Sequence, residues 1–206
     1  MSGILHEKII EAMKKYEERK YDVIYAHMFD KSVWSTLSKK NNNITNEMII
    51  GEAIHRGASV VLDDTKEVCK SLTISIGNII PPALERFVKF NSEGEPYVDI
   101  CGEADGFYNG YPIELKTTRS SKRVFEPEKE WVRRGRIYGW LYDVDKAYLI
   151  VFNVINGKEV DHILQSYSNA EMRDITEKWL KGVFPALSLP ISINIKENVK
   201  KQKRKL

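Results

Sequence analysis

Cysteine is scarce in this chain of 206 residues, which contains only two. Cys69 and Cys101 lie far apart in the sequence and form no Cys-x-x-Cys pair. Zinc and iron–sulfur sites built on cysteine need several closely spaced thiolates, so the sequence excludes such sites, including a four-cysteine cluster. Two isolated cysteines are typical of a protein in a reducing compartment, and we therefore expect an intracellular location.

Long apolar runs are also missing. The chain has no stretch of about 18 consecutive apolar residues, the length that a membrane-spanning helix needs. Its N-terminus lacks the basic segment followed by an apolar one that marks a secretory signal. We therefore expect a soluble, cytoplasmic protein with no membrane partner.

Charge of one sign does not dominate, since the net charge is only +3 at pH 7. The chain as a whole is no polycation, so a nucleic-acid surface would have to be a local patch. The Gly-x-x-x-x-Gly-Lys-Ser/Thr loop of ATP-driven motors is absent as well. Any tracking along a polymer would be unaided or would need a partner that supplies the motor.

Hydrophobic residues make up 42% of the chain, an ordinary share for a globular protein. Strand and helix patterns both occur, which predicts an α/β (α+β) fold. We expect a core domain at 45–190, an N-terminal helical region at 1–44 that packs on it, and a basic, disordered tail at 191–206. The amphipathic helix predicted at 4–20 could instead serve a homo-oligomer, and the sequence leaves this open.

The most informative stretch is 102–116, which has the pattern of a β-hairpin. Asn109-Gly110 is a strong signal for a two-residue type I′ turn, because both central positions of that turn need a positive φ. A turn of this kind sets the register of the two strands. The expected facing pairs are Tyr108–Tyr111, Phe107–Pro112, Asp105–Glu114 and Glu103–Lys116.

This register predicts two carboxylates on one face, from Asp105 and Glu114. Directly opposite residues have Cβ atoms about 4.5–5.5 Å apart, and like charges at that distance repel each other. Lys116 points to the same face, because side chains alternate along a strand. A divalent metal site with a nearby lysine would explain the arrangement. A solvated face with simple ion pairs is the alternative.

At these residues the chain resembles the PD-(D/E)XK nuclease superfamily, which carries Gly-x-x-Asp followed by Glu-x-Lys. Gly102 and Asp105 match the first motif, and Glu114 and Lys116 match the second. The closest resemblance is to the RecB-like branch, which includes CRISPR-associated adaptation nucleases and phage-type exonucleases. Members of that branch also have an upstream helical histidine, which His55 in Gly-Glu-Ala-Ile-His-Arg-Gly matches.

The branch also carries a downstream Gln-x-x-x-Tyr helix, and here the match is partial. Tyr138 stands at the tyrosine position, but Arg134 replaces the usual glutamine. Many relatives hold an iron–sulfur cluster with four cysteines, which this chain cannot do. The resemblance covers 45–155 and implies a restriction-endonuclease-like fold with a mixed central β-sheet flanked by helices.

The resemblance implies Mg²⁺ or Mn²⁺ as cofactor, without an iron–sulfur cluster. The implied metal ligands are His55, Asp105, Glu114 and the backbone carbonyl of Leu115. The implied catalytic residues are Lys116, Asp105, Glu114 and Tyr138. A histidine on a helix is more often structural, and its place in the motif order is what favours ligation. Glu52 and Glu103 are candidates for a supporting role beside the ligands.

A basic segment follows the hairpin. Between 116 and 136 there are eight basic and three acidic residues, a local net charge of +5. Phosphate recognition is the natural use of such a patch, and a solvated surface is the alternative. The candidate DNA contacts are Arg119, Lys122, Arg123, Arg133, Arg134 and Arg136.

Together these features predict a metal-dependent DNA nuclease. The resemblance implies a single-stranded DNA exonuclease, 5′ to 3′, with possible endonuclease activity. A structure-specific or double-stranded DNA endonuclease is the runner-up. Two further classes stay open: a catalytically inactive nucleic-acid-binding module and an interaction protein built on the N-terminal helix. Aromatic residues at 21–37 either complete the core or form a base-stacking wall for single strands.

Overall fold

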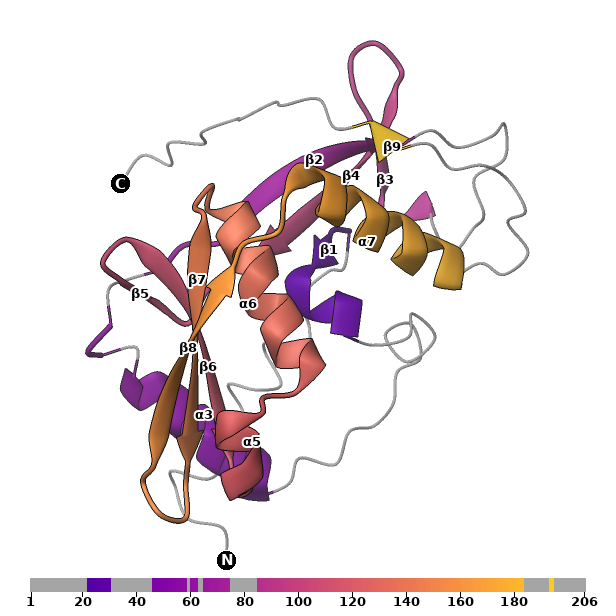
Figure 1. Cartoon of the computed structure of the whole chain (residues 1–206). Coiled ribbons are helices and arrows are strands. Elements are labelled where there is room, and N and C mark those ends of the chain that lie inside the picture. Colours follow the sequence, from indigo (N-terminus) through magenta and orange to yellow (C-terminus); the bar gives the residue numbers. More distant parts are fainter. Residues whose placement is uncertain are drawn as a thin grey trace, which may run out of the picture.

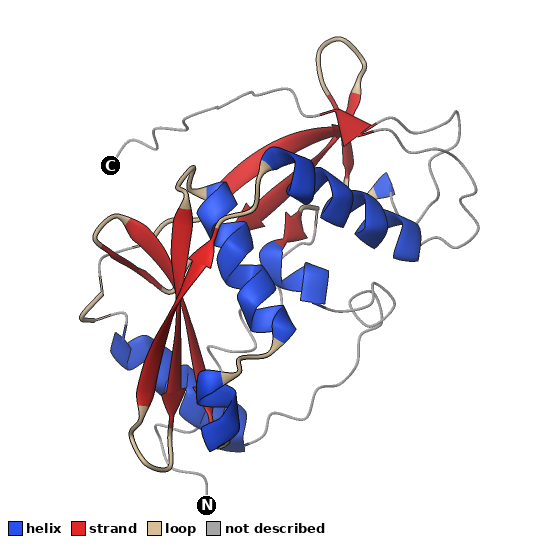
Figure 2. Cartoon of the chain, in the orientation of Figure 1, coloured by secondary structure: helices blue, strands red, loops and turns tan. Residues whose placement is uncertain are grey.

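The computed structural model describes residues 22–30, 46–58, 60–62, 65–74, 85–183 and 193–194. The helix predicted at 4–20 and most of the basic tail lie outside these residues. The described part contains both helices and strands (Figure 1, Figure 2). The predicted α/β class is therefore confirmed.

The strands form two sheets, whereas the sequence analysis expected one central sheet. Sheet A contains β1 (Ile24–Tyr25), β2 (Val68–Ile74), β3 (Val88–Phe90), β4 (Pro96–Gly102) and β9 (Ile193–Asn194). Sheet B has the order β5 (Gly106–Tyr108), β6 (Tyr111–Thr118), β7 (Lys146–Asn153) and β8 (Glu159–Gln165). Both sheets are mixed, because β1 pairs with β4 and β6 pairs with β7 in parallel. The strand β9 falls within the predicted tail and pairs with β2.

The helices connect and cover these sheets. They are the 3₁₀ helix η1 (Ala26–Asp30), α3 (Asn46–Ala58), α5 (Ser121–Phe125), α6 (Lys129–Leu141) and α7 (Asn169–Val183). The chain passes from β6 through α5 and α6 to the parallel strand β7, which is a βαβ crossover. Figure 2 shows α6 running between the two sheets and α7 lying beside sheet A. Periodicity in the sequence predicts a helix at 128–142 and strands at 146–152 and 159–164, and these match α6, β7 and β8.

The core explains the central place of α6. Ile137 and Trp140 of this helix are buried with Ile100 of β4 and Met172 of α7, all at most 4% exposed. A smaller cluster joins Val124 of α5 to sheet B. Burial of apolar surface on both sides therefore holds α6 between the sheets. Phe29 also lies in the core, against Trp179, which favours the packing role for the aromatic segment at 21–37 over the base-stacking wall.

The helix α3 differs from its prediction. The apolar spacing in the sequence predicts a helix that continues to residue 62, but α3 ends at Ala58 and residues 60–62 form a turn. Ile50 and Val61 were expected in its core stripe and are exposed by 42% and 81%. The apolar periodicity continued past the helix end, so it overestimated both the length of the helix and the burial of its stripe.

The prediction of two isolated cysteines is wrong. Cys69 and Cys101 form a disulfide. The antiparallel register of β2 and β4 places them directly opposite each other, with Cα atoms 4.1 Å apart. Two residues separated by 32 positions give no sequence signal of such a register. None of the described helices is long and apolar enough to cross a membrane.

Candidate active site

The site lies at the N-terminal end of strand β5, where the pairing of β5 with β6 stops. The hairpin turn has φ values of 51° at Asn109 and 79° at Gly110, as the type I′ prediction requires. The pairs Phe107–Pro112 and Tyr108–Tyr111 are confirmed, but the ladder stops at Gly106 opposite Ile113. Because β5 has three residues and β6 has eight, no strand of the described part pairs with the last part of β6 on this side.

Asp105 lies on this side of β6 and bonds to it. Its backbone N–H donates to the Ile113 carbonyl at 2.9 Å, and its Oδ2 accepts from the Leu115 N–H at 2.7 Å. The predicted facing pairs Asp105–Glu114 and Glu103–Lys116 are therefore wrong, because strand β5 begins only at Gly106 and residues 103–105 lie outside the ladder. The carboxylate occupies an unpaired rung of the sheet instead of repelling a second carboxylate across it.

His55 reaches Asp105 from helix α3. A Cβ atom on Gly51 would lie 3.3 Å from Oγ1 of Thr117, so this glycine lets the helix approach β6 closely. One turn later, Nδ1 of His55 lies 3.2 Å from Oδ1 of Asp105. Burial alone would raise the pKa of Asp105, but the hydrogen bond and charge of His55, with Lys116 and the Leu115 N–H, hold that pKa below its ordinary range.

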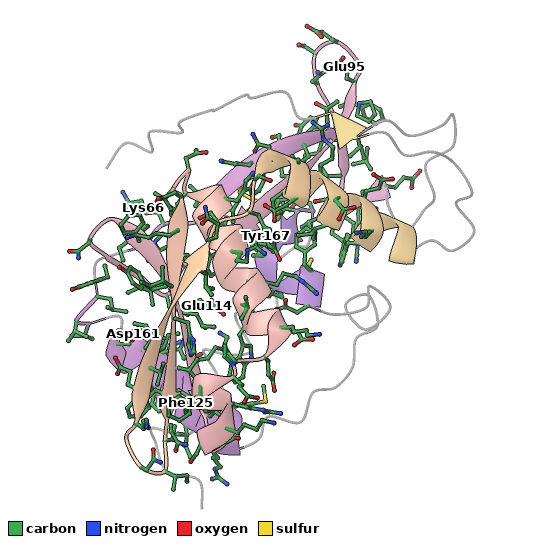
Figure 3. All side chains as sticks on the ribbon, viewed as in Figure 1. Lys66, Glu95, Glu114, Phe125, Asp161 and Tyr167 are labelled. Carbon is green, nitrogen blue, oxygen red and sulfur yellow. A yellow bond between two sulfur atoms is a disulfide. The ribbon has the colours of Figure 1, made fainter. Side chains whose placement is uncertain are left out.

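Glu114 is the buried centre of the site, with 1% of its side chain exposed (Figure 3). Its Oε1 contacts Nζ of Lys116, and Nη1 of Arg134 lies 3.3 Å away. Both contacts join groups of opposite charge in a buried setting. Burial raises the pKa of Glu114, and the charges of Lys116 and Arg134 lower it only in part. Lys116 also donates to the Leu115 carbonyl at 3.0 Å.

Arg134 is held from its other side by Asp30 of η1. Nε of Arg134 lies 3.1 Å from Oδ2 of Asp30, and Nη2 contacts the same oxygen. The charges of Glu114, Tyr138 and Asp30 outweigh burial and raise the pKa of Arg134 further above its usual value, so it remains a cation. The sequence does not single out Asp30 as a site residue, because Asp30 lies 104 positions from Arg134. The one available signal is the arginine at the position where glutamine is usual, because a buried arginine needs a compensating acid.

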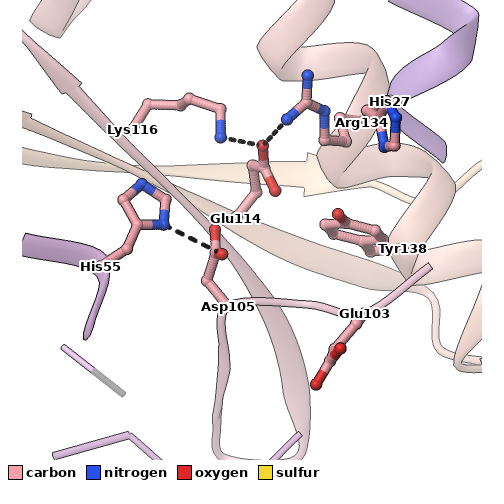
Figure 4. Close-up of a pocket in the computed structure, with 8 residues that line it drawn as sticks. All are labelled: His27, His55, Glu103, Asp105, Glu114, Lys116, Arg134 and Tyr138. Atoms are coloured by element: carbon pink, nitrogen blue, oxygen red, sulfur yellow. Dashed lines mark hydrogen bonds and ion pairs between the residues drawn. The ribbon is translucent and has the colours of Figure 1, made fainter. Parts of the chain in front are cut away.

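These side chains line a single cavity of about 330 Å³ (Figure 4). Five of the predicted catalytic and metal-binding residues contribute side chains to it, together with Glu103 and Arg134. The lining is His27, His55, Glu103, Asp105, Glu114, Lys116, Arg134 and Tyr138. His27 is a second residue that sequence analysis had not selected, and its place on η1 beside Asp30 brings it here. Glu103 accepts a hydrogen bond from Oγ1 of Thr65 at 3.3 Å.

Tyr138 is 8% exposed and lies at the cavity wall because Gly102 makes room for it. A Cβ atom on Gly102 would lie 2.8 Å from Cε1 of Tyr138 and 2.9 Å from Cδ1 of Leu141. This contact is a packing reason for glycine in the Gly-x-x-Asp motif. The strand β4 and helix α6 could not otherwise lie so close together.

The predicted DNA contacts are spread over several places. Arg134 alone among them lines the cavity. Arg119, Lys122 and Arg123 lie on or near α5, where Lys122 and Arg123 pair with Glu126 and Glu128. Arg133 donates to the Phe29 carbonyl at 2.8 Å, and Arg136 donates to the Gln165 carbonyl at 2.8 Å. A role of these five in binding phosphate stays a prediction.

Glu52 was predicted to support the metal ligands, but it does not line the cavity. Its Oε1 lies 2.9 Å from Nε of Arg56, one turn further along α3. The pair is half-exposed, with 32% of the Glu52 side chain accessible. Its placement thus favours an ion pair on the helix surface.

The donor types in the cavity fit a divalent cation: carboxylates, an imidazole and a backbone carbonyl. The buried Oε1 of Glu114 fits as well, because it is a carboxylate oxygen that already contacts two cationic groups. The arrangement brings only His55 and Asp105 together, because Glu114 is directed to Lys116 and Arg134. Accordingly, no group of three His, Cys, Asp or Glu side chains in the described part is close enough to hold a metal ion.

The comparisons with known proteins concern the fold. The crystal structure of SSO0001 is similar to this chain with a TM-score of 0.64, and the match covers 87% of each chain at 16% sequence identity. At that identity the similarity shows the fold alone. No family model and no curated protein matches the chain.

Proposed function

We propose that this protein is a metal-dependent DNA nuclease of the PD-(D/E)XK type, with the RecB-like branch as its nearest resemblance. The observation that carries the proposal is that Asp105, Glu114 and Lys116 line one cavity with His55 and Tyr138. These residues come from β6, from the turn before β5, from α3 and from α6. Residues from four elements with the right chemistry for phosphodiester hydrolysis thus meet beside one strand, β6.

His55, Asp105, Glu114 and the Leu115 carbonyl would hold Mg²⁺ or Mn²⁺. The ion would supply a Lewis acid for the phosphoryl oxygens and would lower the pKa of a water molecule. Because imidazole is a borderline donor, we expect Mn²⁺ to support activity at least as well as Mg²⁺.

Lys116 has the central role among the protein groups. Its Nζ lies between Glu114 and the Leu115 carbonyl, so it can orient the attacking water and offset the negative charge of the phosphorane. Tyr138 lies on the opposite side of the cavity from His55 in Figure 4, where its hydroxyl can position the nucleic acid. Arg134 supplies a second cation for phosphate in place of a neutral glutamine.

The proposed substrate is single-stranded DNA, degraded from the 5′ end, and this choice rests on the resemblance. The test is a time course on 5′- and 3′-labelled single-stranded and duplex DNA with EDTA, Mg²⁺ or Mn²⁺. Loss of the 5′ label first from single strands would support the proposed polarity. Internal cuts in duplex or branched DNA would favour the structure-specific or double-stranded endonuclease.

Two variants and a matched control test the catalytic residues. We expect Lys116→Ala and Asp105→Ala each to reduce the cleavage rate by about 10²–10³-fold, as does loss of a group that stabilises a transition state. Lys178→Ala is the control, because Lys178 is an exposed lysine of α7 that pairs with Asp174. DNA binding without cleavage, unchanged in all three variants, would refute the enzyme and leave a binding module.

A further inference from the structure

Arg134 forms a bridge between two buried acids, and this bridge bears on how the cavity accepts a cation. One end of the guanidinium contacts Asp30 and the other contacts Glu114. The Asp30 side chain is 6% exposed and that of Glu114 is 1% exposed. A charge-assisted contact between such buried groups is much stronger than one at the surface, because the surrounding dielectric is low.

The bridge directs Glu114 away from the other candidate ligands. Its Oε1 receives both Lys116 and Arg134, while Asp105 pairs with His55. The contacts in Figure 4 therefore divide into two groups, with Glu114 in one and Asp105 in the other. Both cation contacts fall on Oε1 of Glu114, so a metal ion that binds this oxygen has to displace Arg134 from it.

We propose that Arg134, anchored by Asp30, competes with the divalent cation for Glu114 and so sets the metal affinity of the site. This inference rests on the proposed metal-dependent function. In the cation-free protein Arg134 neutralises Glu114. When the cation takes Glu114, the guanidinium remains bound to Asp30 at the cavity wall, where it faces a substrate phosphate. Arg134 is thus a positioning residue that links metal entry to phosphate binding.

The charges in the cavity allow a test that separates competition from simple electrostatics. The charged side chains that line it include Glu103, Asp105, Glu114, Lys116 and Arg134, and Asp30 binds Arg134 on its other side. The variant R134Q makes the net charge more negative by one, so it would attract a cation under either view. The double variant D30N/R134Q removes one charge of each sign and keeps the net charge of wild type. Tighter cation binding by this double variant would therefore come from the loss of the Arg134–Glu114 contact and not from a change in the net charge of the protein.

The experiment is calorimetric titration of Mn²⁺ into the full chain in the absence of DNA. We expect Mn²⁺ to bind R134Q at least about tenfold more tightly than wild type, and the double variant several-fold more tightly. D30N should bind Mn²⁺ more weakly, because Arg134 then has no second acidic partner and pairs with Glu114 alone. Lys178→Gln, which removes an exposed positive charge on α7, is the control for total charge and should keep the wild-type affinity.

The outcomes distinguish this inference from the proposed function. Wild-type Mn²⁺ affinity in the double variant, with metal-dependent cleavage intact in the wild type, would overturn the competition and leave the nuclease. Absence of Mn²⁺ binding in wild type and all variants would overturn both. If R134Q fails to fold because Asp30 is left unpaired, the double variant, which has no unpaired charge, decides the question alone.

Discussion

Two arginines of helix α6, Arg134 and Arg136, lie two positions apart and have different surroundings. Arg134 binds acids that are almost fully buried, in the cavity. Arg136 binds Glu171, whose side chain is 46% exposed, and its guanidinium lies 3.9 Å from the centre of the Tyr167 ring. The comparison shows that one basic segment can serve two purposes, because α6 faces the site on one side and the β8–α7 connection on another.

The largest expected difference between the two arginines is in the stability that is lost when the acidic partner of each is removed. Asp30→Ala leaves Arg134 buried without its anchor and should lower the free energy of unfolding by about 3 kcal/mol, as for other broken buried pairs. Glu171→Ala should cost about 1 kcal/mol, because Glu171 also accepts from Ser168 N–H at 2.8 Å in the capping box that begins α7. Urea denaturation measures both. Equal losses would contradict the assignment of Arg134 to a buried network.

A glycine of α6 allows the Arg136 side to be perturbed alone. A Cβ atom on Gly139 would lie 1.8 Å from Oγ and 3.3 Å from Cα of Ser166, next to the residues that bind Arg136. Gly139→Ala should therefore lower the free energy of unfolding by about 1–3 kcal/mol through overpacking.

The matched control for this substitution is Gly57→Ala in α3, where a Cβ atom would meet no atom within 4 Å. Alanine should there raise stability by up to about 1 kcal/mol, since it favours the helix. Thermal unfolding compares the two variants. A Gly139→Ala protein as stable as wild type would show that β8 and α6 can separate without cost.

High salt should weaken the ion pair of Arg136 more than that of Arg134. Double-mutant cycles measure the coupling of Arg136 with Glu171 and of Arg134 with Asp30. The exposed pair should couple by less than about 1 kcal/mol and lose most of this in 1 M NaCl, where the screening length is about 3 Å. The Arg134–Asp30 coupling should change little. A similar salt response in both pairs would mean that solvent reaches Arg134 as freely as Arg136.

The smallest expected effect is a dependence of stability on pH that comes from Glu171, the exposed acid. Hydrogen bonds from Ser168, with a smaller contribution from Arg136, hold the pKa of Glu171 below its usual value of 4.5. Because this pKa is lower in the folded state, the stabilisation is complete above about pH 4.5 and is lost as the pH falls through the folded value. Wild type should therefore be more stable than Glu171→Gln at pH 6, and the difference should shrink as the pH falls below 4.5. A constant difference would show that the charge of Glu171 has no part in it.

Much of the fold could be predicted because its signals are local. The Asn109-Gly110 turn, the strands β7 and β8 and the helix α6 follow from turn chemistry and periodicity within short windows. The predictions failed where the outcome depends on distant segments. The end of α3 and the register that joins Cys69 to Cys101 are examples. The place at which β5 stops pairing with β6 is another.

By itself, the sequence determined the α/β class, the hairpin and most of the acidic and basic residues of the proposed site. Only the tertiary structure decided which of them meet. It brought His55 to Asp105, placed His27 in the cavity and set Asp30 against Arg134 across 104 positions of chain. The physical reason is that spacing along a strand or helix orders neighbours within one element, whereas the packing of separate elements determines the partner of a buried charge.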